Sequence, residues 1–137
     1  KASRSEQKAI ISAELSWAFF RMNEFEHAIE AAGNVLKLDP GYESPQDVYR
    51  LLGFSYSALQ KDELAVQNLK KSAQIDRTSE KQQIVLFELT KIFFKNQKYR
   101  QAEKLITEIE PYFYQNRKEY WLSILFYKGF IFYYRNQ

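Results

Sequence analysis

Side chains that could carry out chemistry are few in this sequence, and their spacing gives them no partners. His27 is the only histidine, and its neighbours Glu24, Glu26 and Glu30 share one predicted helix with it. A catalytic or metal-binding histidine needs groups that converge on it from several elements. Because the chain has one histidine and no cysteine, the sequence favours an exposed structural role for His27 and predicts no metal site.

The remaining candidates for catalysis are carboxylates and glycine loops. Glu108 and Glu110 could be imagined as an acid and a base, but the surrounding sequence gives no indication that either is buried. The four glycines, at positions 33, 41, 53 and 129, are too scattered to form a phosphate-binding loop. We therefore expect no catalytic residue, no enzymatic activity and no cofactor.

Composition narrows the class of partner. The 137 residues are enough for one domain with a real core, and the net charge of +3 comes from 20 basic and 17 acidic residues mixed along the chain. A nucleic-acid binder concentrates its basic residues on one stripe, so we expect no nucleic acid. The most apolar stretch, residues 121–134, includes Ser123 and Lys128 and is too short to span a bilayer, so we expect no membrane insertion. The absence of cysteine fits the cytoplasm, which we favour, and also the periplasm.

An internal repeat is the main signal for the fold. Ala28, Ala65 and Ala102 lie in similar amphipathic segments, and each is 37 residues from the next. Equal spacing of this kind indicates stacked supersecondary units. We expect an all-α domain over residues 1–137, made of hairpins at 5–40, 44–76 and 79–111 and a lone helix at 118–135.

Local signals place the helix ends. The first helices of the hairpins are expected at 5–22, 45–60 and 80–96, and the second helices at 24–38, 62–75 and 98–110. Ser44 before Pro45 is a good helix start, and Ser79 with Gln82 resembles a capping box. Pro111 is expected to end its helix and to leave an irregular connection at 112–117.

These positions resemble the tetratricopeptide repeat family. That family places an aromatic residue, a Leu-Gly pair and a tyrosine in the first helix of each hairpin, and an alanine in the second. The second hairpin fits best, with Tyr49, Leu52-Gly53, Tyr56 and Ala65. The first and third carry Leu15-Ser16, Phe19 and Ala28, and Leu89-Thr90, Phe93 and Ala102. The resemblance implies a right-handed α-solenoid, although 37 residues exceed the family's usual 34.

The family resemblance also implies where a partner would bind. In tetratricopeptide folds the outward side of each first helix lines a concave groove. The residues predicted there form an aromatic floor and a basic rim: Ile10, Trp17, Phe20, Arg21, Arg50, Phe54, Phe87, Lys91, Phe94 and Lys95. The alternative is that these side chains pack tightly against the neighbouring hairpin. The family's clamp for a C-terminal carboxylate is not matched, because its places hold Ala13, Trp17, Leu51, Ile84 and Glu88.

The sequence therefore predicts a module that binds another protein, through an extended or helical segment with apolar anchors and some negative charge. A structural spacer or dimerisation segment of a larger protein is the first alternative, and RNA binding is the second. The helix at 118–135 is apolar on nearly every face. The terminal units of a repeat stack normally have a polar outer face. We therefore expect either further hairpins beyond Gln137 or burial of this helix against another chain, including self-association.

Overall fold

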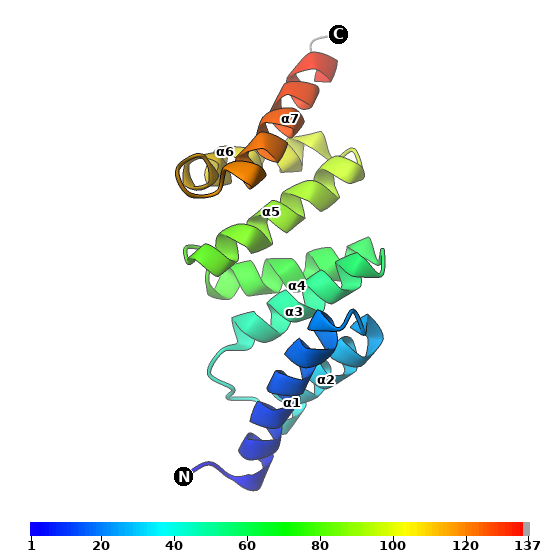
Figure 1. Cartoon of the computed structure of the whole chain (residues 1–137), viewed down its shortest axis with the longest axis vertical. Helices are drawn as coiled ribbons and strands as arrows, with labels where there is room; N and C mark the ends of the chain where they lie inside the picture. Colours follow the sequence, from blue (N-terminus) through cyan, green and yellow to red (C-terminus); the bar gives the residue numbers. More distant parts are fainter. Residues whose placement is uncertain (136–137) are drawn as a thin grey trace. The chain divides into compact units, whose positions relative to one another are not determined.

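The computed structural model describes residues 1–135, which form seven α-helices and no strand within that range (Figure 1). The helices are α1 (Arg4–Arg21), α2 (Phe25–Leu38), α3 (Pro45–Ala58), α4 (Asp62–Ile75), α5 (Glu80–Lys95), α6 (Tyr99–Asn116) and α7 (Lys118–Arg135). The all-α prediction is confirmed. The predicted bounds agree to within two residues at every helix end except the C-terminus of α6.

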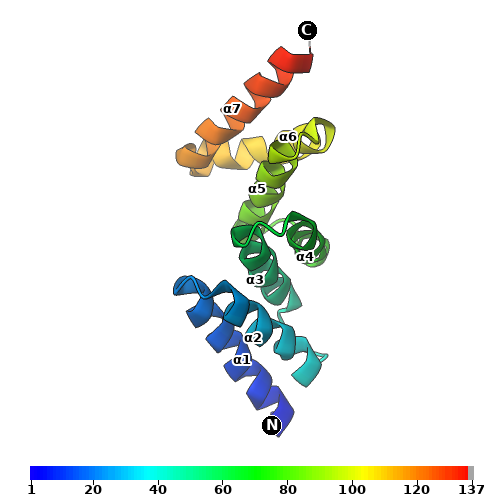
Figure 2. The ribbon, with the colours of Figure 1, turned by 90° about the vertical axis from the view of Figure 1, so that its right-hand side faces the viewer.

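The chain divides into two compact units, residues 1–77 with α1 to α4 and residues 78–137 with α5 to α7. In the first unit α1 packs on α2, α2 on α3 and α3 on α4, and Figure 2 shows α1 and α2 side by side. In the second unit α5 packs on α6, and α6 on α7. Helices that are neighbours in sequence therefore pack in succession within each unit.

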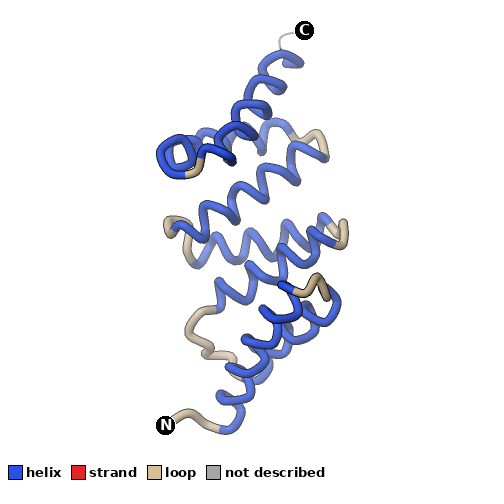
Figure 3. The backbone as a smooth tube through the Cα atoms, in the orientation of Figure 1, coloured by secondary structure: helices blue, strands red, loops and turns tan. Residues whose placement is uncertain are grey.

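The turn inside each hairpin has the same backbone conformation. Asn23, Gln60 and Gln97 have φ angles of 61°, 62° and 61°, and they stand 37 residues apart. After each of them the next N–H donates to a carbonyl five residues back, which is the bond of a Schellman motif. These bonds run from Glu24 to Phe19 (2.9 Å), from Lys61 to Tyr56 (2.9 Å) and from Lys98 to Phe93 (2.8 Å). The three short turns are drawn as loops in Figure 3.

Small residues allow the helices of a hairpin to approach closely. Ala28, Ala65 and Ala102 are all fully buried. Gly53 on α3 is packed under Leu69 of α4, so that an added Cβ would overlap Leu69 Cδ2 and lie 2.5 Å from its Cγ. This contact explains why the residue on α3 is glycine.

The positions that match Gly53 in the other hairpins hold small polar residues. The Ser16 hydroxyl donates to the carbonyl of Ala13 at 2.6 Å, and the Thr90 hydroxyl donates to that of Leu86 at 2.8 Å. Each hydroxyl is therefore satisfied within its own helix, which is the condition for burying it.

One predicted boundary is wrong. Helix α6 continues through Pro111 to Asn116, and no irregular connection exists at 112–117. A proline inside a helix removes one backbone hydrogen bond and costs about 3 kcal/mol. Continuing the helix buries Phe113 completely, one turn beyond the buried Ile109. Burial of a phenylalanine contributes about 1.5–3 kcal/mol, which offsets most of the cost of the proline.

A smaller correction concerns the helix caps. Ser44 and Ser79 are N-caps as predicted, and Pro45 occupies the first turn of α3, but neither serine side chain makes a capping hydrogen bond. The capping box lies instead at the start of α1. There the Ser3 hydroxyl accepts from the Glu6 N–H and the Glu6 carboxylate accepts from the Ser3 N–H, both at 3.1 Å.

Candidate protein-binding surfaces

The residues predicted to bind a partner fall into two sets, one in each unit. The first set, on α1 and α3, is Ile10, Trp17, Phe20, Arg21, Arg50 and Phe54, and the second, on α5, is Phe87, Lys91, Phe94 and Lys95. The two sets are two separate candidate surfaces.

In the first unit the aromatic residues form a continuous row. The rings of Trp17 and Phe20 lie 5.8 Å apart, and Phe20 lies 6.4 Å from Phe54 and 5.6 Å from Phe25. Trp17, Phe20 and Phe54 are all half-buried. Trp17 and Phe20 pack against the core of α1, α2 and α3 on one side. They therefore pack against the neighbouring hairpin and also leave ring surface open, and their role in binding a partner stays a prediction.

Ile10 and Arg21 are exposed, whereas Arg50 is not. The exposed fraction of Ile10 is 48%, and that of Arg50 only 6%. The Arg50 guanidinium donates to Asp47 Oδ1 at 2.8 Å and lies 5.3 Å from the centre of the Trp17 ring. The prediction of Arg50 as part of an accessible basic rim is therefore wrong, because this cation is buried and supports the aromatic row from within.

A small pocket adjoins this row, and its charge is negative. It has a volume of about 180 Å³, and its lining includes Ile10, Trp17, Tyr42, Glu14 and Asp47. Burial raises the pKa of the Tyr42 phenol above 10.0, and four nearby carboxylates, led by Asp47, raise it further.

In the second unit Phe87 belongs to the core. Its exposed fraction is 8%, and its ring lies 4.8 Å from Tyr120, 5.7 Å from Phe113 and 6.4 Å from Tyr127. The prediction that Phe87 binds a partner is therefore corrected. The ring instead joins α5 to α6 and α7 at the centre of the unit.

The other predicted residues of α5 keep some access to solvent. Phe94 is half-buried, and its ring lies 4.5 Å from Tyr127 and 5.0 Å from Phe130 of α7. Lys91 is exposed and pairs with Glu88 at 3.2 Å, and Lys95 is exposed. This part of the predicted site is thus occupied largely by the protein's own terminal helix.

Most of the exposed large apolar side chains of the second unit lie on helix α7. Ile124 and Ile131 are buried, but the outward side is open, and the large apolar residues exposed there are Leu122, Leu125, Phe126, Phe132, Tyr133 and Tyr134. The hairpin of α5 and α6 therefore covers only part of α7. Contiguous exposed apolar side chains of this kind usually mark a contact site.

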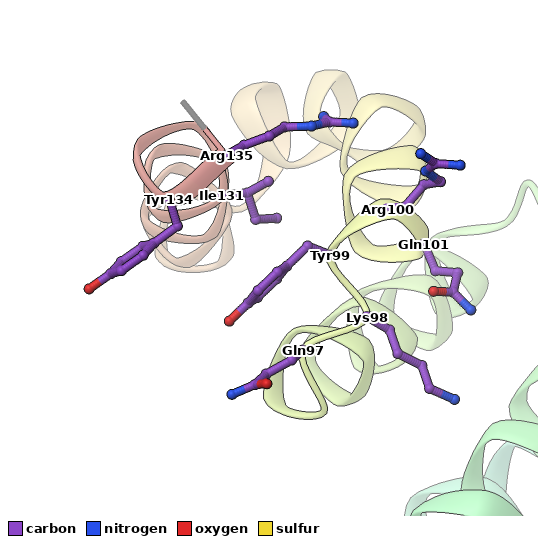
Figure 4. A pocket seen from close by; sticks show the side chains of 8 residues that line it. All are labelled: Gln97, Lys98, Tyr99, Arg100, Gln101, Ile131, Tyr134 and Arg135. Carbon is purple, nitrogen blue, oxygen red and sulfur yellow. The ribbon is translucent and has the colours of Figure 1, made fainter. Parts of the chain in front are cut away.

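A wider pocket opens at the C-terminal end of α7. It has a volume of about 560 Å³ and is lined by Gln97, Lys98, Tyr99, Arg100, Gln101, Ile131, Tyr134 and Arg135 (Figure 4). Tyr99 and Tyr134 extend in the same direction from α6 and α7, and Ile131 lies between the two helices. Arg135 is paired with Glu103, so Lys98 and Arg100 supply the positive charge of the pocket beside its apolar wall.

Other possible sites have little structural support. Among residues 1–135 no group of three or more histidine, cysteine, aspartate or glutamate side chains is arranged to hold a metal ion. His27 is exposed, with Nδ1 3.3 Å from Glu24 Oε2. In the same part of the chain no helix is both long enough and apolar enough to cross a membrane.

Sequence reasoning missed both pockets. Tyr42 reaches the first pocket because the connection between α2 and α3 passes beside α1, and only its place after the Asp39-Pro40-Gly41 turn could have pointed to it. The second pocket brings Lys98 and Arg100 of the α6 N-terminal region close to Arg135 of α7. These residues are far apart in sequence, so no local sequence pattern could have predicted the pocket.

No protein-family model matches the chain, and no curated protein sequence matches it. The resemblance to the tetratricopeptide repeat family therefore rests on the repeat within the chain itself.

Proposed function

We propose that this protein is a non-catalytic protein-interaction module that binds a segment of a partner through the half-buried aromatic row of its first unit. The observation that carries the proposal is that Trp17, Phe20 and Phe54 form a connected row that remains partly open, beside the exposed Ile10. Aromatic residues supported by a core are typical binding hot spots, because they offer large apolar area at little entropic cost.

The charge beside the row defines the partner more closely. The pocket next to Ile10 and Trp17 contains the carboxylates of Glu14 and Asp47. Arg50 is already paired with Asp47, so the Glu14 carboxylate carries the negative charge of this pocket. We therefore propose a partner segment with large apolar side chains and an adjacent lysine or arginine. This replaces, for the first unit, the acidic partner expected from the sequence.

We also propose that the protein is a tetratricopeptide-like repeat, with the right-handed stacking that this resemblance implies. Three features at the same interval support it, namely the left-handed turn residues, the Schellman bonds and the buried alanines. A repeat of this class is built to display side chains from successive first helices. That property fits a binding role better than a catalytic one.

Selection from a library of displayed peptides tests the proposed function. We expect the protein to enrich peptides that combine large apolar residues with lysine or arginine. Ile10→Ala should weaken their binding measurably, because Ile10 is exposed and is not part of the core. Phe20→Ala should weaken it by about 2 kcal/mol or more.

Leu64→Ala is the matched control, since Leu64 is an exposed apolar residue on α4, away from the aromatic row. Thermal melting of each variant separates loss of binding from loss of fold. The proposal is wrong if the selected peptides bind Ile10→Ala and folded Phe20→Ala as tightly as they bind the unmodified chain.

A further inference from the structure

Helices α3 and α7 occupy the same place in the repeat, with each residue of α7 numbered 76 higher than its counterpart in α3. Gly129 then corresponds to Gly53. Burial agrees with this register, because Val48 and Ser55 of α3 are buried, and so are their counterparts Ile124 and Ile131 of α7. The inward face of both helices is therefore equivalent.

A different face of α3, the one that α4 covers, shows which kind of element packs at this position of the repeat. Helix α4 covers it through three contacts spaced along α3. The Ser72 hydroxyl donates to the carbonyl of Gln46 at 2.8 Å, and Lys71 Nζ lies 5.5 Å from the centre of the Tyr49 ring. One turn further on, Leu69 fills the space above Gly53.

In α7 the equivalent face has no covering helix among the described residues. Leu122 and Leu125 correspond to Gln46 and Tyr49, and their exposed fractions are 62% and 38%. Phe132 corresponds to Tyr56 and is 70% exposed. A Cβ added at Gly129 would meet nothing within 4 Å. The space that Leu69 fills above Gly53 is thus open above Gly129.

We propose that this face of α7 binds an amphipathic helix of a partner protein, packed antiparallel to α7 with a large aliphatic side chain seated over Gly129. The partner helix would repeat the pattern of α4, in which an alanine lies one turn before the leucine, as Ala65 lies before Leu69. This surface is in the second unit, and the proposal does not depend on the aromatic row of the first.

Charge favours a partner helix over a second copy of α7. A helix antiparallel to α7 begins near the C-terminal end of α7, where Lys98 and Arg100 line the wide pocket together with Arg135, which is paired with Glu103 (Figure 4). An acidic first turn is attracted there, and Asp62 and Glu63 give α4 such a turn. The first turn of α7 instead combines Lys118 with Glu119, so a second α7 brings no net negative charge.

The test uses a labelled peptide with the α4 sequence, residues 61–77, and the intact chain, with fluorescence anisotropy as the measurement. Saturable binding is expected. Gly129→Ala should weaken it at least tenfold, because the methyl group fills this space. The free variant should fold normally and melt no lower, since nothing lies near that Cβ.

Gly33→Ala is the matched control on the chain. It makes the same chemical change in the middle of α2, also in open space, and should leave peptide binding unchanged. On the peptide, replacing the leucine that matches Leu69 with alanine should weaken binding to the unmodified chain and make Gly129→Ala almost without further effect.

Three results would overturn the proposal. One is no saturable binding of the peptide. Another is binding that Gly129→Ala leaves unchanged. The third is a dimer of the chain alone, measured by sedimentation, that Phe132→Glu dissociates, because a second copy would then be the occupant. None of these results bears on the peptides selected by the first unit, so failure here is distinguishable from failure of the proposed function.

Discussion

Replacing Gly53 with alanine tests the packing of the first unit most directly. The new Cβ would overlap the side chain of Leu69 and lie 3.2 Å from the Leu69 backbone nitrogen. Leu69 is fully buried, so its side chain has no free space to turn into. Relief of the clash therefore requires a shift of α4 itself.

Two opposing effects set the size of the change. Overpacking of a core typically costs about 1–3 kcal/mol. Alanine is favoured over glycine inside a helix by about 1 kcal/mol, which offsets part of that cost. We expect Gly53→Ala to lose up to about 2 kcal/mol of unfolding free energy. At Gly129 the added methyl group meets no other atom, so Gly129→Ala should raise the unfolding free energy by up to about 1 kcal/mol. The changes in stability of the two variants should therefore have opposite signs.

Urea unfolding followed by tryptophan fluorescence is the assay. The chain has two tryptophans, Trp17 and Trp121, and they lie in different units. In a Trp121→Phe background the signal comes from Trp17 alone and reports the first unit, which avoids treating two units as one transition. A midpoint for Gly53→Ala equal to or above that of the parent would refute the packing of Gly53 against Leu69.

Three further predictions follow from particular contacts. Ala102→Leu should destabilise the second unit by roughly 1–3 kcal/mol, because Ala102 is fully buried; an unchanged melting temperature would contradict this. Pro111→Ala should stabilise the same unit by up to about 3 kcal/mol, since an N–H is restored opposite the carbonyl of Thr107; Trp121 fluorescence in urea measures it, and a loss of stability would refute the account. The raised pKa of Tyr42 means that the folded state holds the phenol proton more tightly than the unfolded state. The stability that Tyr42 contributes in this way is therefore fully present below pH 10 and is lost as the pH rises above 10. Tyr42→Phe should flatten the alkaline fall in stability, and an identical fall in both proteins would count against this.

Much of the fold could be predicted because its signals are local. The Ser44-Pro45 start depends on backbone conformations that a few residues set by themselves. The same holds for the turns at Asn23, Gln60 and Gln97, where short polar segments leave room only for a hairpin. Hence the bounds of α2, α4 and α7 differ from the predicted ones by at most one residue.

The candidate site was less predictable, because exposure depends on residues far away in sequence. Arg50 was expected at a rim but is buried between Asp47 and the Trp17 ring. Phe87 was expected in a groove, but Tyr120 and Phe113 enclose it. Helical periodicity places a side chain on a face of its helix, and only the packed neighbours decide whether that face is covered.

The sequence by itself determined the repeat. The 37-residue spacing of the alanines places each helix in its hairpin, because helix and turn conformations are decided over a few residues. Only the tertiary structure decided how far α6 extends, since burial of Phe113 against α5 and α7 offsets the local cost of Pro111. The tertiary structure alone also shows that the space over Gly53 is filled and the one over Gly129 is open. The two glycines look alike in sequence, and the difference lies in whether another helix supplies the atoms that pack against them.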